Sequence, residues 1–389
     1  MTERLYYNDP YLAEFSATVA SVDEIGGRRV VKLDRTAFYP TSGGQPYDVG
    51  VLGDAQVVEV LDSDAGDVLH VIEGELAVGA MVHGRIDWGR RFDHMQQHTG
   101  QHVLSAAFDR VLNARTESFH LGIDSATIDL NRDMTAQQIT GAEEEANRVV
   151  WEDRPVKISF VDAAEAARLP LRKEPGREGK LRLIEVEGYD LSACGGTHVA
   201  RTGAIGIIAV TSWERFKGGT RVGFVCGGRA LRAHRQLRDV AAASSRLLSI
   251  LAPELPAAIE RLQAEAKDAR RVIKDLQLRL ARYEAQALAA AASSGRVICA
   301  LEGWDQNGLK TIASAVAETP GHAAALVGNA APVAIVIARH PDAPVDSAAV
   351  LKKVLEKFGG KGGGRPELAQ GGGLQGDPQA IAAYLRELL

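Results

Sequence analysis

Residues 92–108 read FDHMQQHTGQHVLSAAF and carry three histidines four residues apart, His94, His98 and His102. On an α-helix this spacing stacks the three side chains along one face, and such a row of imidazoles suggests a metal site. The stretch lacks the glutamate of the HExxH peptidases, in which that glutamate is the general base. The peptidase mechanism is therefore excluded, and the helix is expected to supply part of a different metal site.

Residues 190–198, DLSACGGTH, offer further ligands, with two glycines between Cys194 and His198. Thiolate and imidazole are typical zinc ligands, and glycine lets the backbone pass close to an ion. Histidines at helical spacing alone are a weak signal, because many are surface or core residues, but the CxxxH partner strengthens it considerably. Four protein ligands would leave a tetrahedral zinc no open position for water. The sequence thus leaves open whether the metal activates water or only holds a substrate.

The bulk composition describes a globular chain with more than one core. Its 389 residues, 46% of them hydrophobic, predict two or three domains. Because no window has the length and apolarity of a membrane span or a signal peptide, we expect a cytoplasmic protein without a membrane partner. Three widely spaced cysteines argue against a disulfide framework, and Cys226, in an apolar strand, is interpreted as core. A net charge of −5 requires any RNA partner to meet local basic patches.

The order of patterns predicts an α+β chain of four parts. Residues 1–90 contain short β-branched runs between glycine and aspartate turns, which are typical of a small barrel-like antiparallel β domain. Residues 91–230 combine the histidine helix with further strands and helices, and are predicted to form an α/β domain that binds zinc. Residues 231–292 are rich in alanine, leucine, arginine and glutamate, and predict helices. Residues 293–389 alternate strand and helix patterns and predict a C-terminal α/β domain.

The helical part is divided in two by Pro253 and Pro256, because proline removes a backbone donor and clashes inside a helix. In the second helix, apolar residues recur at intervals of three and four, as in a coiled-coil seam. This seam consists of Ile259, Leu262, Ala266, Ala269, Ile273, Leu276, Leu280, Tyr283 and Ala287. An intramolecular antiparallel hairpin is the simpler use of that seam. A homodimer, through this segment or the C-terminal domain, is the alternative.

Two segments are candidates for RNA contact. Residues 168–182 hold six lysines and arginines, including Arg172 and Lys173, against two glutamates. A charge run is by default a solvated loop, but basic residues beside a metal site suit a phosphate backbone. Residues 359–373, GGKGGGRPELAQGGG, form a glycine-rich loop whose ordering costs considerable chain entropy, which a plain connector need not incur. A disordered linker is the plain interpretation of that loop; the alternative is a surface that approaches RNA through Lys361, Arg365 and Gln370.

Four motifs make the chain recognisable. In sequence order they are TAFYPTSGGQPYDVG, HTGQH, SACGGTH and GGGRPELAQGGG. Together they resemble the editing domain and the C-terminal domain of alanyl-tRNA synthetase, and the resemblance covers essentially the whole chain. Because the sequence starts directly in the β domain, we expect no aminoacylation domain. The chain is therefore similar to the long form of the freestanding AlaX-type editing proteins, which carry a DHH-associated C-terminal domain.

The resemblance implies a zinc-dependent hydrolase that cleaves the ester of tRNA(Ala) mischarged with serine, or with glycine. It implies that His98, His102, Cys194 and His198 are the zinc ligands. It also places Thr36 and Gln45 in the site, facing the amino acid, and adds Lys361, Arg365 and Gln370 as RNA contacts. His94, one turn before the first ligand, is expected to support the ligands or to contact phosphate, and we include it with Thr36 and Gln45 as a catalytic candidate. We expect Thr36 to recognise the serine hydroxyl, because excluding a hydroxyl by size alone discriminates weakly.

Two other interpretations stay open. A closed four-ligand site is also compatible with an RNA-binding protein whose zinc is purely structural. A hydrolase for a different mischarged tRNA is the second, because threonyl-tRNA synthetase editing domains have a similar His/Cys arrangement. A phosphoesterase is excluded, since the sequence has no DHH motif and no aspartate cluster suited to paired metals.

Overall fold

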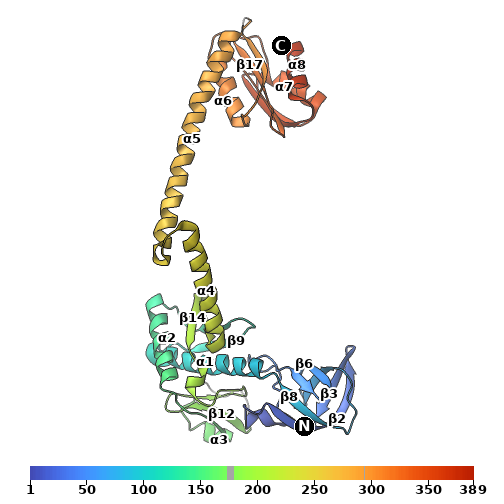
Figure 1. Cartoon of the computed structure of the whole chain (residues 1–389), viewed down its shortest axis with the longest axis vertical. Helices are drawn as coiled ribbons and strands as arrows, with labels where there is room; N and C mark the ends of the chain where they lie inside the picture. The colour runs from blue at the N-terminus through green and yellow to red at the C-terminus, as the bar shows by residue number, and fades with distance from the viewer. Residues whose placement is uncertain (173–178, 293) are drawn as a thin grey trace. The chain divides into compact units, whose positions relative to one another are not determined.

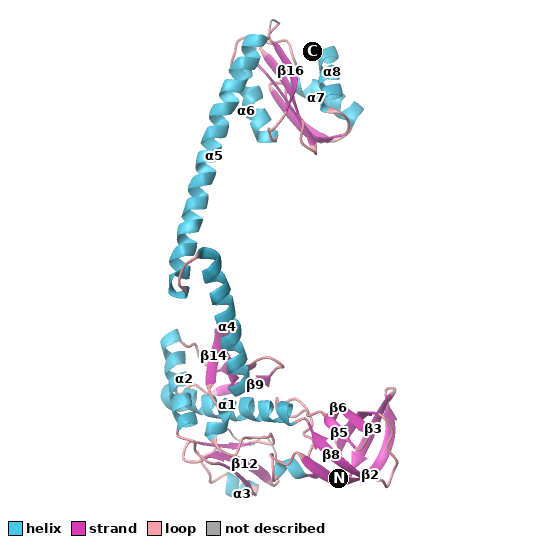
Figure 2. Cartoon of the chain, in the orientation of Figure 1, coloured by secondary structure: helices cyan, strands magenta, loops and turns pink. Residues whose placement is uncertain are grey.

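The computed structural model describes residues 1–172, 179–292 and 294–389, which form two compact units, Met1–Ala243 and Ser244–Leu389 (Figure 1). Helices and strands occur in both units (Figure 2), which confirms the predicted α+β class. The domain boundaries drawn at residues 90, 230 and 292 stay predictions. None of the described helices is both long and apolar enough to cross a membrane.

The first unit begins with a closed barrel of six strands, which confirms the predicted barrel-like β domain. Along its first strand, Phe15, Ala17 and Val19 are buried while the residues between them face outward, as strand periodicity requires. In barrel order the strands are β2 (Glu14–Ile25), β3 (Arg28–Leu33), β7 (Val68–Glu73), β6 (Ala55–Asp62), β5 (Gly50–Leu52) and β8 (Met81–Ile86). Beside the barrel lie the parallel pair β1 (Glu3–Arg4) and β4 (Arg35–Thr36) and the 3-10 turn η1 (Leu5–Tyr7).

Helix α1 (Trp88–Leu112) follows the barrel directly and carries the histidines, as predicted. Asp87 caps its first turn by accepting a hydrogen bond from the backbone N–H of Arg90 at 3.0 Å. Asn113, in the left-handed conformation with φ of 51°, ends it. Every residue from 97 to 108 is buried, so this part of the helix lies inside the unit and both of its faces meet protein.

Among the described residues, two sheets, two further helices and the first part of α4 (Gly227–Leu248) complete the first unit. The four-stranded sheet has the order β14 (Ile208–Phe216), β15 (Gly219–Cys226), β10 (Ala126–Leu130) and β9 (Thr116–Leu121). The three-stranded sheet consists of β11 (Val156–Val161), β12 (Leu181–Val186) and β13 (Asp190–Ala193). The remaining elements are α2 (Ala136–Trp151), α3 (Ala163–Ala166) and the turn η2 (Thr202–Ile205). A capping box formed by Thr135 and Gln138 begins α2.

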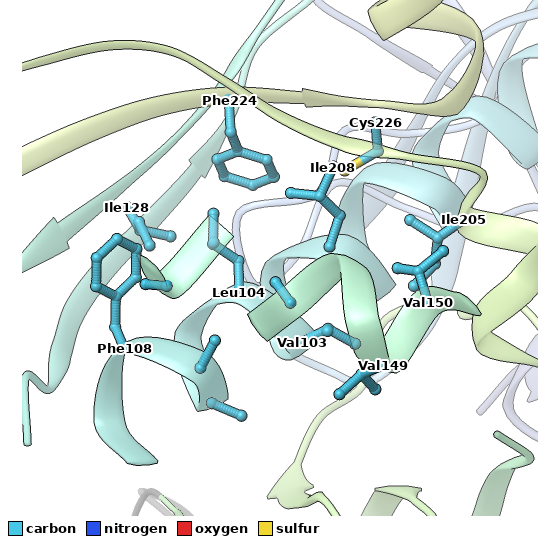
Figure 3. Close-up of a cluster of buried hydrophobic side chains, with 14 of the residues drawn as sticks. Val103, Leu104, Phe108, Ile128, Val149, Val150, Ile205, Ile208, Phe224 and Cys226 are labelled. Carbon is cyan, nitrogen blue, oxygen red and sulfur yellow. The ribbon is translucent and has the colours of Figure 1, made fainter. Parts of the chain in front are cut away.

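The core of this unit joins α1 to α2 and to the four-stranded sheet. Figure 3 shows Leu104 and Phe108 of α1 gathered with Ile128 of β10 and Phe224 of β15. Close packing here depends on Gly100, because a Cβ at that position would lie 2.3 Å from Sγ of Cys226. Cys226 is fully buried in this cluster, which confirms its interpretation as a core residue. The packing fixes the part of α1 that carries His98 and His102.

The second unit is a three-layer α/β domain that begins with a long helix. Its sheet has the order β16 (Arg296–Leu301), β17 (Ala323–Gly328), β18 (Val333–Arg339), β20 (Leu368–Leu374) and β19 (Lys361–Arg365). The helices are α5 (Leu255–Ala291), α6 (Gln306–Val316), α7 (Ser347–Phe358) and α8 (Pro378–Leu388); α4 (Gly227–Leu248) crosses the boundary between the units, and the turn η3 (Ala252–Glu254) precedes α5. One layer packs α5 and α6 on the sheet, and the other packs α7 and α8 on its opposite face (Figure 1).

Along α5 the side chains of the predicted seam are exposed, for example Leu276 at 56% and Tyr283 at 71%. The predicted helical hairpin that would cover this seam, and the alternative of a homodimer, both stay predictions. The predicted two helices are present, with the break at residues 249–254.

The glycine-rich segment is a β-hairpin, so the prediction of a loop was wrong. Strands β19 and β20 pair antiparallel over its length. A Cβ on Gly362 would lie 2.5 Å from the carbonyl oxygen of Gln370, and one on Gly364 would lie 2.3 Å from that of Leu368. These glycines therefore let two strand backbones approach closely. A run of glycines considered without the facing strand is typical of a loop.

Candidate metal centre

Four side chains converge inside the first unit, His98 and His102 from α1, and Cys194 and His198 from the loop after β13. One ligand atom of each lies within 4.8 Å of the other three. Sγ of Cys194 is 3.4 Å from Nε2 of His98 and 3.3 Å from Nε2 of His198. With Zn–N bonds of about 2.0 Å and a Zn–S bond of about 2.3 Å, neighbouring ligands of a tetrahedral zinc lie about 3.3–3.5 Å apart. The cluster predicted from the two motifs therefore exists, and the distances from Cys194 to His98 and His198 match those between ligands of a tetrahedral zinc.

Each histidine of the cluster is held by its second ring nitrogen. Nδ1 of His98 donates to Oε1 of Gln45 at 2.7 Å, and Nδ1 of His102 donates to a carboxylate oxygen of Asp190 at 3.0 Å. Nδ1 of His198 lies 3.2 Å from Oγ1 of Thr99. Such outer hydrogen bonds fix both the tautomer and the orientation of metal-binding imidazoles. They turn the Nε2 atoms of His98 and His198 toward Cys194.

The charges at the cluster favour a thiolate. Burial by itself raises the pKa of the Cys194 thiol, but its histidine neighbours, including the hydrogen bonds from His102 and His198, outweigh burial and hold that pKa well below its usual range. Burial lowers the pKa of His198 to about 3, so its ring is neutral. Burial also lowers the pKa of His102, yet Asp190 and Cys194 together outweigh burial and raise that pKa to about 9. A metal ion that binds here would displace a proton from His102.

The loop that carries Cys194 is packed tightly against the helix. A Cβ on Gly196 would lie 2.2 Å from Cε1 of His98 and 2.4 Å from its Nδ1. On the other side, Nη1 of the buried Arg182 donates to the carbonyl oxygens of Cys194 at 2.8 Å and of Gly196 at 2.9 Å, and its Nε donates to the carbonyl of Tyr7 at 2.9 Å. Arg182 thus fixes the loop against η1.

We expect the substitution Gly196→Ala to lower metal affinity by at least about 10-fold, because the new methyl group would displace the His98 ring from its orientation. Gly195→Ala is the matched control, since its Cβ would meet nothing nearer than the Tyr7 hydroxyl at 3.5 Å, an ordinary contact. The measurement is competition for zinc against a chromogenic chelator. Equal affinities for the two variants would show that the ring does not depend on this glycine.

Gln45 lies beside the cluster, and its side-chain amide contacts protein. The side chain is fully buried. Its Nε2 donates to Oγ1 of Thr197 at 2.8 Å, and its Oε1 accepts from the backbone N–H of Thr197 at 3.1 Å as well as from His98. Gln45 therefore joins the barrel's loop to the helix and to the cysteine loop. Its contact with the amino acid of a substrate stays a prediction.

Thr36 is also fully buried, and its hydroxyl is engaged. Nδ1 of His70 lies 3.1 Å from the carbonyl of Val31 and donates to it, which leaves Nε2 as an acceptor for the Thr36 hydroxyl at 2.8 Å. Burial lowers the pKa of His70 to about 4, consistent with this neutral tautomer. The Thr36 oxygen accepts in turn from the N–H of Phe38 at 3.1 Å. Recognition of a substrate hydroxyl by Thr36 stays a prediction.

His94 lies outside the four-ligand cluster. Its side chain is 3% exposed, and none of the described residues forms a hydrogen bond with its buried Nδ1. Burial, with Arg90 nearby, lowers its pKa to about 4, so the ring is neutral. The three stacked histidines thus divide into two that join the cluster and one that does not, and a catalytic role for His94 stays a prediction.

The predicted RNA contacts are in different settings. Arg172 has a side chain only 15% exposed, in an ion pair with Asp190, while Lys173 lies outside the described residues. In the second unit Lys361 and Arg365 are exposed on β19, and neither forms an ion pair with a described residue. Gln370 is half-buried on β20. RNA binding by these residues stays a prediction.

Sequence reasoning assigned no role to several residues of the centre. Asp190 lies within the cysteine motif and Thr99 within the histidine motif, and each bonds a ligand. Their positions inside the two motifs could have indicated a role at the site. The hydrogen bonds themselves could not be predicted from local sequence, because the bonded residues are separated by 88 positions for Asp190 and His102 and by 99 for Thr99 and His198. Arg182 was assigned only to a basic run, although it is buried under the cysteine loop.

Three domain families match the chain. The DHHA1 domain matches residues 294–389, the class II (A) tRNA synthetases match residues 3–90, and the threonyl and alanyl tRNA synthetase second additional domain matches residues 181–222. A solved structure, the C-Ala domain of Aquifex aeolicus alanyl-tRNA synthetase, matches with 24% identity and a TM-score of 0.22 over 23% of this chain and 84% of that one.

Several relatives align with nearly the whole chain, and two of them illustrate the match. The alanine–tRNA ligase of Pyrococcus abyssi is 34% identical over 95% of this chain, but only 42% of the ligase is covered. The alanyl-tRNA editing protein AlaX-L of Pyrococcus horikoshii is 33% identical over 387 residues, which cover 95% of this chain and 94% of that protein. The chain therefore belongs to the AlaX-L family of alanyl-tRNA editing proteins.

Proposed function

We propose that the protein is a zinc-dependent hydrolase that removes serine, and also glycine, from mischarged tRNA(Ala). The observation that carries the proposal is the alignment with AlaX-L along 94% of that protein. It is supported by a three-histidine, one-cysteine cluster whose donor set suits zinc better than harder ions. In this reaction water adds to the acyl carbon, the ester C–O bond breaks, and the terminal ribose leaves with a proton on its oxygen.

The residues of the cluster would hold zinc, and bound zinc supplies Lewis-acid chemistry, polarising an ester carbonyl or a water molecule. The protein's own contribution is orientation. Gln45 ties the barrel to His98, and we assign it a positioning role for that ring. Thr36 is proposed to read the serine hydroxyl with the lone pair that its two hydrogen bonds leave free. His94, neutral and without a hydrogen-bond partner at Nδ1 among the described residues, is proposed to support the site from the preceding helical turn.

The direct test is to incubate the protein with Ser-tRNA(Ala), Gly-tRNA(Ala) and Ala-tRNA(Ala) and to measure release of each amino acid. We expect rapid release of serine, release of glycine, and little release of alanine, because a site built to bond the hydroxyl binds the serine transition state better. Ester cleavage on other mischarged tRNAs alone would favour a different substrate. Salt-sensitive tRNA binding without any cleavage would favour an RNA-binding protein with structural zinc.

A further inference from the structure

A chain of three side chains leads from the metal cluster toward the basic segment. Nδ1 of His102 donates to Oδ2 of Asp190 at 3.0 Å, and Nε of Arg172 donates to Oδ1 of the same carboxylate at 2.6 Å. Nη2 of Arg172 also donates to Oγ of Ser192 at 3.1 Å, and that hydroxyl lies 3.1 Å from Oδ2 of Asp190. The carboxylate of Asp190 thus joins the two sides, since Oδ2 accepts from His102 and Oδ1 accepts from Arg172.

The carboxylate of Asp190 is buried, with a side chain 1% exposed, whereas Arg172 is 15% exposed. A buried carboxylate is costly unless it is paired and hydrogen-bonded, and removing one partner leaves the remaining charge poorly compensated. Without the guanidinium, the Asp190 carboxylate would lose the donor that holds it on the side away from His102 and would be free to turn toward other donors. That change weakens the bond that orients His102.

The position of Arg172 is itself fixed by the backbone. Its N–H donates to the carbonyl oxygen of Leu191 at 3.0 Å, which places it beside β13, next to Asp190 and Ser192. An arginine whose only role was to bind RNA would not need the backbone bond to Leu191, nor side-chain bonds to both Asp190 and Ser192. The contacts of Arg172 therefore favour a role inside the protein.

We propose that Arg172 is a positioning residue for the metal centre, which acts through Asp190 to orient His102. The inference rests on the metal-binding part of the proposed function and assigns Arg172 a task other than RNA contact. A fork of two donors suits this task, and lysine offers only a point charge on a flexible stem.

The test compares Arg172→Gln, Arg172→Lys and Asp190→Asn in the full chain. Zinc affinity is measured by chelator competition, and kcat and KM on Ser-tRNA(Ala) are measured at saturating zinc. We expect Arg172→Gln to lower zinc affinity by about 10-fold or more and to lower kcat with KM unchanged. Arg172→Lys should be intermediate. In the Asp190→Asn background, Arg172→Gln should have no further effect on zinc affinity, because the two act as one unit.

Arg221 provides the matched control. It forms the same kind of pair with Asp129, at 2.6 Å and 2.9 Å, but on strands that carry no metal ligand. Arg221→Gln should leave zinc affinity unchanged. Unchanged zinc affinity with a raised KM in Arg172→Gln would overturn the proposal in favour of RNA contact, as would additive losses in the double variant. If the wild type binds zinc but cleaves no ester, the proposed function fails while the affinity series still decides the role of Arg172.

Discussion

Cys194→Ala is expected to leave the protein without bound zinc and to lower serine release from Ser-tRNA(Ala) by more than about 100-fold, the upper range for loss of an outer partner alone. The variant removes the only sulfur ligand of the cluster and the negative charge that balances the ion. It also leaves the three imidazoles around a space that the thiolate filled, within 3.4 Å of two of them. Metal analysis after gel filtration and a deacylation assay measure the two effects.

The other cysteines are internal controls for this experiment. Cys299→Ala changes a half-buried residue of the second unit, and Cys226→Ala changes a core residue next to Gly100. Both should keep full zinc content, although Cys226→Ala should lose some stability. Circular dichroism of Cys194→Ala separates loss of the metal from loss of the fold. Retention of zinc and activity in a folded Cys194→Ala protein would exclude the assigned site.

The four-residue cluster was predictable because residue types and local spacing in the sequence indicate which side chains can bind a metal. The four-residue interval places His98 and His102 on one face of α1, and the CxxxH spacing places Cys194 and His198 in one loop; the fold keeps both arrangements. The barrel, too, follows from local alternation of apolar residues such as Phe15, Ala17 and Val19. In these cases the pattern that predicts the element also determines which side chains are buried.

The partners of the ligands could not be predicted in this way. Gln45 meets His98 across 53 residues and Thr197 across 152, and no local pattern specifies such contacts. Arg172 lies in a basic run, and only its approach to Asp190 distinguishes it from a solvated arginine. The prediction for the glycine-rich hairpin was wrong for a related reason. Gly362 is required because the backbone of the facing strand lies so close, whereas glycine by itself indicates a loop.

Arg91→Met is expected to lower the free energy of unfolding of the first unit by about 3–5 kcal/mol, because it leaves the Asp48 carboxylate buried without its partner. Both side chains are fully buried. The guanidinium also donates to the carbonyls of Pro10 at 2.8 Å and Ala37 at 2.6 Å, and Asp48 accepts from the N–H of Tyr39 at 2.6 Å. Urea unfolding followed by tryptophan fluorescence measures the change, since three of the four tryptophans lie in this unit.

The same pair should connect stability to the metal centre. Arg91 lies on α1 two turns before His98, and Asp48 lies three residues after Gln45. The Arg91–Asp48 pair therefore holds the loop that carries Gln45 against α1, where Gln45 bonds to His98. The double variant Arg91→Met/Asp48→Asn should therefore be less destabilised than the sum of the single variants, because no uncompensated charge remains. Arg221→Met, whose side chain is 33% exposed, should cost about 1 kcal/mol or less. Equal losses of unfolding free energy for Arg91→Met and Arg221→Met would mean that burial of the Arg91–Asp48 pair does not determine the size of the loss. Other contacts would then have to hold the Gln45 loop against α1.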